Sequence, residues 1–131
     1  MLVVDASAAV ALALSRAGLA ALGDDLAAPA LLLSEATSVV HGLAARREIT
    51  NELADQGHAG LLSAPIHYHY SDELYRSARA VARRLGWTKT SDAEYVALAR
   101  LLGVALVTRD LRLQRGAGHL VEIVTPDEVA G

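Results

Sequence analysis

The sequence predicts a three-layer α/β/α fold with a mostly parallel central sheet, formed by a single domain over residues 1–131. Short apolar runs alternate along the chain with longer segments of strong helix formers, as in proteins built from repeated strand and helix units. Residues 104–107 form a continuous apolar run, which is typical of a strand buried on both faces of a parallel sheet. A length of 131 residues is enough to bury about two thirds of the surface of the unfolded chain.

The first half of the chain predicts two strands that each lead into a helix. Residues 2–4 are apolar and end at Asp5, and residues 6–15 contain strong helix formers without a helix breaker. A second apolar run over residues 29–33 predicts the next strand, which is followed by a helix over residues 34–47.

The second half continues the alternation. The patterns predict a helix over residues 50–62, an extended segment over residues 66–70 and an amphipathic helix over residues 72–86 that is capped by Ser71. In the amphipathic helix the apolar residues recur at spacings of three and four.

The C-terminal part is expected to complete the sheet. Ser91 and Glu94 have the spacing of a capping box, which predicts a helix from Ser91 to Gly103. Strands are then expected over residues 104–107 and 119–124.

The composition excludes several classes of protein. There is no cysteine, so neither a disulfide framework nor a thiolate zinc site is expected, and a cytoplasmic location is the default. The apolar segment 8–14 is not expected to be a secretion signal, because Asp5 precedes it and no basic residue comes before Arg16. No apolar run is long enough to suggest a membrane span, and no Gly-rich phosphate loop follows the first strand.

Four acids stand where the predicted fold would bring them together. Asp5 and Asp110 follow two of the predicted strands, Glu35 lies in the first turn after a third, and Asp92 opens a later helix. Each acid alone has an ordinary explanation as a helix cap or as a partner of the helix dipole. In an open parallel sheet, however, the carboxyl ends of the strands border the crevice in which ligands bind. We therefore expect the four carboxylates to converge.

Converging carboxylates predict a bound cation, because without one they would repel one another and take up protons. Oxygen-only ligands select hard ions, so Mg²⁺ is expected, with Mn²⁺ as a substitute. Such ions lower the pKa of a bound water and stabilise charge on a phosphate under attack, which is nuclease chemistry. They would also offset the net charge of −3, which is otherwise unusual for a protein that binds nucleic acid.

Short motifs extend this interpretation over nearly the whole chain. They are Val-Val-Asp-Ala-Ser-Ala at residues 3–8, Ser-Glu-Ala at 34–36, Thr-Ser-Asp-Ala at 90–93 with Tyr-Val-Ala-Leu-Ala at 95–99, and Leu-Val-Thr-Arg-Asp at 106–110. Their order and spacing resemble those of PIN-domain ribonucleases, and the chain length is similar to that of the VapC toxins of bacterial VapBC toxin–antitoxin pairs. The resemblance implies a PIN-like fold and a Mg²⁺-dependent endoribonuclease that cuts structured RNA such as transfer or ribosomal RNA. It also implies a homodimer, and a VapB-like antitoxin that blocks the site with a C-terminal segment.

The resemblance also implies roles for individual residues. The positions that match the four metal-binding acids of the family are Asp5, Glu35, Asp92 and Asp110. The positions that match the small hydroxyl residues supporting the site are Ser7 and Thr108. One departure is Ser91, because many relatives carry an aromatic residue before the third acid.

The candidate RNA contacts are arginines on two segments. Three of them share one face of the helix predicted over residues 72–86, and two flank the last acid. The arginines on the helix could form a row of side chains that bind phosphates. The alternative is an ordinary solvated face, in which an aspartate four residues earlier partly neutralises the first arginine. The candidates are Arg76, Arg79, Arg83, Arg109 and Arg112.

Two other functions stay open on the sequence alone. The first is a catalytically silent module that binds RNA or a partner protein and in which the acids are only structural. The second is a phosphoryl-transfer enzyme with Asp5 as nucleophile, as in haloacid-dehalogenase-like sites, although Ala6 and Ser7 do not provide the second aspartate of such sites.

Overall fold

The computed structural model describes residues 1–130 and has one sheet with the strand order β3-β2-β1-β4-β5. All neighbouring strands are parallel. The strands are β1 (Leu2–Val4), β2 (Leu26–Pro29), β3 (Ile66–His69), β4 (Leu106–Val107) and β5 (Ile123–Val124). The predicted parallel α/β fold is therefore confirmed.

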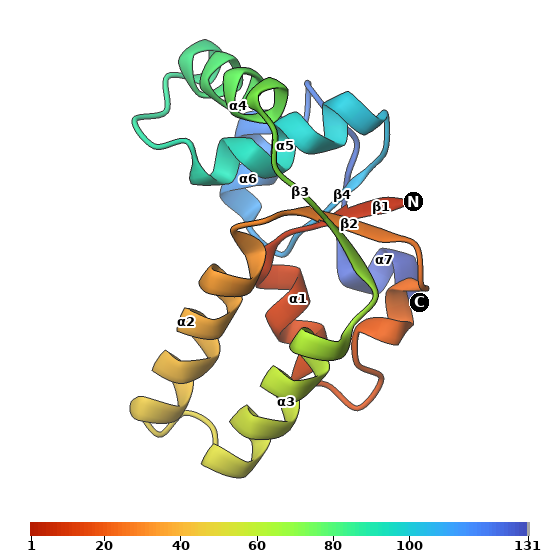
Figure 1. Cartoon of the computed structure of the whole chain (residues 1–131), viewed down its shortest axis with the longest axis vertical. Coiled ribbons are helices and arrows are strands. Elements are labelled where there is room, and N and C mark those ends of the chain that lie inside the picture. Colours follow the sequence, from red (N-terminus) through yellow and green to blue (C-terminus); the bar gives the residue numbers. More distant parts are fainter. Residues whose placement is uncertain (131) are drawn as a thin grey trace.

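Helices cover both faces of the sheet (Figure 1). One face carries α1 (Ala6–Ala13), α2 (Leu32–Ala45), α3 (Asn51–Ser63), α7 (Pro126–Ala130) and the short 3-10 helix η1 (Leu19–Leu22). The other face carries α4 (Asp72–Leu85), α5 (Ser91–Leu102) and α6 (Leu111–Ala117). The pair α2 and α3 extends away from the sheet as a helical hairpin (Figure 1). None of the helices within residues 1–130 has the length and apolar character needed to cross a membrane.

The centre of the sheet forms the core. Val3 and Val4 of β1 and Val107 of β4 are fully buried, as expected for strands covered on both faces. Helix α3 also packs closely against the end of α1. A Cβ atom at Gly57 of α3 would lie only 2.7 Å from Cδ2 of Leu14, the residue that follows α1. Only glycine fits at this contact without a shift of its neighbours.

Helix α4 has the two ends that the sequence predicts. The Ser71 hydroxyl accepts a hydrogen bond of 3.0 Å from the backbone N–H of Leu74. At the other end Gly86 has a φ of 72°, a left-handed conformation that glycine adopts without strain. The predicted amphipathic helix is confirmed.

The second strand lies earlier than predicted. Residues 29–33 were expected to form this strand. The observed β2 begins at Leu26, which pairs with Leu2 of β1, and it ends at Pro29. The residues after Pro29 enter α2, where Leu32 is fully buried. An apolar run fits a buried strand and a buried helical turn equally well, so periodicity alone misplaced the strand.

The predicted capping box at the start of α5 is wrong. The helix begins at Ser91, after Thr90, which has a nearly helical backbone and makes no capping bond through its side chain. The backbone N–H of Glu94 donates instead to the Thr90 carbonyl, at 3.0 Å. Asp92 still lies in the first turn of this helix, as expected.

The last two strands are shorter than predicted. Of residues 104–107 only the last two pair in the sheet, and of residues 119–124 only Ile123–Val124 do so. Residues 119–122 form the turn after α6 and the connection to β5 instead.

Candidate active site

The four predicted acids lie around one edge of the sheet. Asp5 directly follows β1, Asp110 comes after β4, and Glu35 is in the first turn of α2, which follows β2. Asp92 is in the first turn of α5, a helix that packs against β1 and β2. In Figure 1 this is the edge at which β1 and β2 lead into α1 and α2.

Asp5 is the most deeply placed acid, with a relative exposure of 4%. Its Oδ1 atom accepts hydrogen bonds from the backbone N–H of Ala8 at 2.9 Å and from the Ser7 hydroxyl at 2.8 Å. Its Oδ2 atom accepts a hydrogen bond from the Thr108 hydroxyl. Burial nevertheless raises the pKa of Asp5 above its ordinary value, and the negative charge of Asp110 raises it further.

Ser7 and Thr108 tie Asp5 to the segment after β4. The Thr108 hydroxyl accepts from the backbone N–H of Asp110 at 2.9 Å, and the Ser7 hydroxyl accepts from that of Arg109 at 3.0 Å. The two hydroxyl oxygens are 3.3 Å apart. Both predicted supporting residues therefore lie between two of the acids and fix the Asp5 carboxylate in one orientation.

Glu35 has a partner that the sequence interpretation missed. The buried Tyr95 hydroxyl donates a hydrogen bond of 2.5 Å to Oε1 of Glu35. Burial raises the pKa of Glu35, the bond from Tyr95 lowers it in part, and the charges of Asp92 and Asp5 raise it again. The spacing of Tyr95 could have indicated a place in the site. It follows Asp92 by three residues on α5 and therefore lies on the same face of the helix.

Arg112 lies between the other two acids. Its Nη2 atom is 2.9 Å from Oδ2 of Asp110 and 4.0 Å from Oδ2 of Asp92. Hydrogen bonding to Arg112 holds the pKa of Asp110 below its ordinary value. The pKa of Asp92 is raised by burial and by the charge of Asp110, while Arg112 opposes this shift. Arg112 therefore supplies a counter-charge within the acid cluster, by which we mean Asp5, Glu35, Asp92 and Asp110.

Each of the four acids has an ordinary explanation that its position in the structure fits. Asp5 caps α1 through Ala8, and Asp110 caps α6 through the backbone N–H of Arg112. Glu35 and Asp92 lie inside the first turns of their helices, and the side-chain cap bonds of those helices are absent. Capping therefore accounts for Asp5 and Asp110, whereas Glu35 and Asp92 have only the weaker interaction with the helix dipole as an ordinary explanation.

The donor chemistry of the acid cluster fits a hard divalent cation. All four side chains offer carboxylate oxygens, and three of them have a raised pKa that a nearby cation would lower. Within residues 1–130, no group of three or more His, Asp and Glu side chains is arranged to hold a metal ion on its own. Mg²⁺ does not need such a complete set of protein ligands, because it keeps several of its water ligands and takes others from a substrate phosphate.

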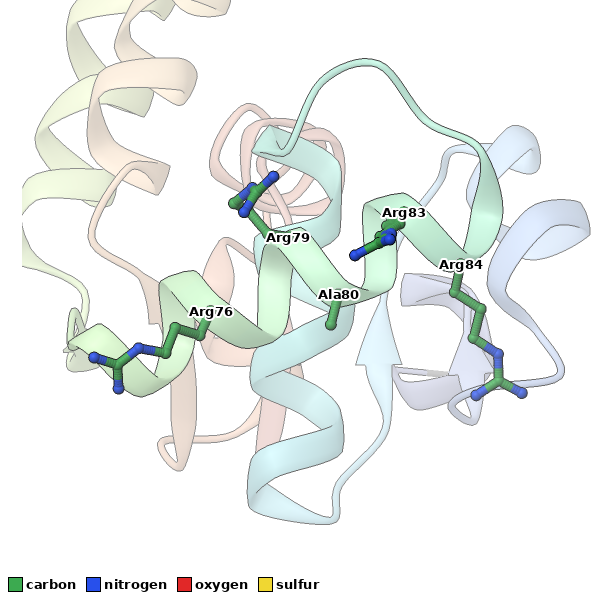
Figure 2. Close-up of a pocket in the computed structure, with 5 residues that line it drawn as sticks. All are labelled: Arg76, Arg79, Ala80, Arg83 and Arg84. Atoms are coloured by element: carbon green, nitrogen blue, oxygen red, sulfur yellow. The ribbon is translucent and has the colours of Figure 1, made fainter.

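The predicted RNA-binding arginines fall on different surfaces. Arg112 alone contacts the acid cluster, whereas Arg109 lines a separate hollow with Ser15 and Asp127. The other three predicted arginines point outward from α4, where they line a hollow of about 440 Å³ (Figure 2). The residues drawn there are Arg76, Arg79, Ala80, Arg83 and Arg84.

The sequence model of the PIN domain matches residues 2–118, a stretch that includes all four acids. This chain belongs to the PIN domain family. Proteins of this family are generally nucleases. No curated protein matches the chain in sequence.

Solved structures of similar proteins share the PIN fold. PAE2754 from Pyrobaculum aerophilum has a TM-score of 0.77 and 24% identity, over 98% of this chain and 92% of that one. A toxin–antitoxin complex from Klebsiella pneumoniae has a TM-score of 0.64 and 18% identity, over 96% of this chain and 98% of that one. VapBC2 from Rickettsia felis, solved with a DNA fragment from its promoter, has a TM-score of 0.61 and 14% identity, over 95% and 98%.

The raised pKa values predict that the metal-free protein becomes less stable as the pH rises. Between the ordinary carboxyl pKa and the raised values of Asp5, Glu35, Asp92 and Glu94, the folded protein binds more protons than the unfolded chain. The free energy of unfolding therefore falls with rising pH in this window, and only Asp110 acts in the opposite sense. We expect the Tm in a chelating buffer to be a few degrees higher at about pH 4, the ordinary carboxyl pKa, than at about pH 7.

Calorimetry of the wild type and of Asp5→Asn checks this expectation. The variant lacks one of the four carboxyl groups with a raised pKa, so its Tm should change less with pH. Identical slopes in the two proteins would show that Asp5 does not carry a raised pKa.

Proposed function

We propose that this PIN domain is a Mg²⁺-dependent endoribonuclease that hydrolyses phosphodiester bonds in structured RNA such as transfer or ribosomal RNA, with Mn²⁺ as a substitute ion. The observation that carries the proposal is the gathering of four carboxylates from four separate segments at one sheet edge. The acids raise the pKa of one another, and this supports the proposal. Repulsion between neighbouring carboxylates destabilises the folded protein unless a cation or a substrate binds there.

In this proposal the cation is held by Asp5, Glu35, Asp92 and Asp110. When bound, it supplies an activated water and stabilises charge on the phosphate. Ser7 and Thr108 keep the Asp5 carboxylate in one orientation, and Tyr95 does the same for Glu35.

Arg112 has a second task in this proposal. Its side chain is 82% exposed, so it is free to exchange the Asp110 carboxylate for a phosphate of the RNA. A guanidinium binds either group through two parallel hydrogen bonds.

The silent binding module remains the alternative, and the capping bonds of Asp5 and Asp110 are the observation in its favour. The phosphoryl-transfer alternative has less support. Three donors already engage the buried Asp5 carboxylate, which leaves it a poor nucleophile.

We further propose that the chain is the toxin of a type II toxin–antitoxin pair, with a VapB-like antitoxin and a homodimeric form. The toxin–antitoxin complexes that share its fold support this role. Apolar side chains on the protruding hairpin also support a protein partner, since Val39 is 44% and Leu62 is 59% exposed.

The test is RNA cleavage by the purified chain. We expect internal cuts in folded RNA in the presence of Mg²⁺ or Mn²⁺, and none after a chelator is added. Gel analysis of end-labelled RNA distinguishes internal cuts from digestion at the ends. Binding of RNA without cuts in either metal would favour the silent module.

A further inference from the structure

A cleft of about 380 Å³ opens beside the acid cluster. It is lined by the loop between α4 and α5, by Asp92, and by Arg112 and Leu113 of α6. Because Arg112 also contacts Asp110, the cleft adjoins two of the four acids. Its volume lies in the range of small-molecule sites, which begins at about 300 Å³, and suits a single nucleotide.

Trp87 forms one wall of this cleft and is the protein's one tryptophan. Its backbone N–H donates to the Ala82 carbonyl at 2.8 Å, which fixes the loop to the end of α4. Its ring rests against α6, since a Cβ atom at Gly116 would lie 3.3 Å from Cζ2 of Trp87. The side chain is only half-buried. An indole held on one side and accessible on another is a surface on which a nucleobase stacks.

Two cationic side chains also line this cleft, in a protein whose net charge is −3. Lys89 is exposed and is the only lysine of the sequence. It takes part in none of the ion pairs found within residues 1–130. Arg112 of α6 also lines the cleft. The cleft therefore combines an aromatic surface with the exposed cation Lys89 and with Arg112, whose charge is shared with Asp110 and Asp92 until a phosphate takes their place. An aromatic ring beside exchangeable cations is the chemistry that binds a nucleotide.

We infer that this cleft, the Trp87 cleft, binds one unpaired nucleotide of the RNA next to the bond that is cut. The base stacks on Trp87, and the phosphate is held by Lys89 and Arg112. The inference rests on the proposed ribonuclease function and adds a substrate class to it. A base inside a duplex is stacked and paired, so the cleft selects RNA with a loop or bulge over continuous duplex.

The single tryptophan gives a direct test. Asp5→Asn protein is titrated in Mg²⁺ with a short stem-loop RNA, so that the RNA is bound without being cut. We expect the tryptophan fluorescence to fall as the RNA binds, with the same midpoint as the anisotropy of a dye on the stem. A blunt duplex of equal length, and a stem-loop with abasic sites in the loop, should leave the fluorescence unchanged. Binding of the intact stem-loop without a fluorescence change would overturn the inference.

A matched pair of variants separates stacking from packing. Both Trp87→Phe and Trp87→Leu keep an apolar side chain against Gly116, but only phenylalanine stacks on a base. We expect the leucine variant to bind the stem-loop roughly 5- to 100-fold more weakly, and the phenylalanine variant to stay within about threefold of the wild type. Equal losses in both variants would overturn the stacking role.

Lys89→Gln is the variant that leaves packing untouched, because the side chain is exposed. It should reduce the slope of log K against log salt for loop RNA by about 0.7. An unchanged slope would remove Lys89 from the site.

Cleavage assays distinguish a failure of this inference from a failure of the proposed function. If the wild type cuts loop RNA and Trp87→Leu does so with the same kcat and KM, the Trp87 cleft is wrong and the ribonuclease stands. If the wild type cuts no RNA while loop RNA still quenches Trp87, the ribonuclease is wrong and the cleft stands as a nucleotide site.

Discussion

We expect Asp5→Asn to slow RNA cleavage by at least about 1,000-fold while the protein stays folded. The amide oxygen of asparagine can still accept the hydrogen bonds from Ala8 and Ser7, and its NH₂ group can donate to the Thr108 hydroxyl. Helix α1 therefore keeps its cap. The variant loses the negative charge, and with it a ligand of the proposed cation.

Single-turnover cleavage with saturating enzyme measures this effect, and a melting curve establishes that the fold is intact. Asp24→Asn is a suitable control, since this exposed aspartate lies outside the acid cluster. Undiminished cutting by Asp5→Asn would reject the metal-dependent mechanism. In cells, growth arrest by the wild type and not by the variant would support the toxin role.

Thr108→Val should produce the second largest effect. Thr108 is fully buried, donates to Asp5 and accepts from the backbone N–H of Asp110 at 2.9 Å. Valine has nearly the same shape but replaces the hydroxyl by a methyl group, so both partners lose a hydrogen bond. We expect stability to fall by about 1–3 kcal/mol because buried polar groups are left unpaired. Cleavage should fall about 10- to 100-fold because Asp5 is no longer held in place.

Thr108→Ser is the matched control, because serine keeps the hydroxyl and loses only a methyl group. Chemical denaturation and single-turnover cleavage of both variants provide the measurements. If valine and serine have the same effect on cleavage, the hydroxyl does not position Asp5 and the lost activity has another cause.

Local sequence signals were sufficient for the outline of the fold and for the acids. Asp5 directly follows an apolar strand, and Asp92 lies in the first turn of a helix, so each is recognisable from its neighbours in the chain. Strand β2 was misplaced because its position depends on pairing with β1 and β3, which a single apolar run does not encode.

Contacts between distant segments were beyond sequence reasoning. The bond between Thr108 and Asp5 joins residues 103 positions apart, and that between Tyr95 and Glu35 joins residues 60 apart. The arginines illustrate the same limit. Arg109 and Arg112 both flank Asp110 in the sequence, yet only Arg112 turns towards the acids.

The order of the strands has a consequence for the newly made chain. β1 is the middle strand and lies between β2 and β4, although β4 is synthesised much later. Asp5 therefore leaves the ribosome early, whereas its partner Thr108 follows 103 residues later and Asp110 comes shortly after it. The acid cluster therefore cannot form on the nascent chain until residue 110 has left the ribosome.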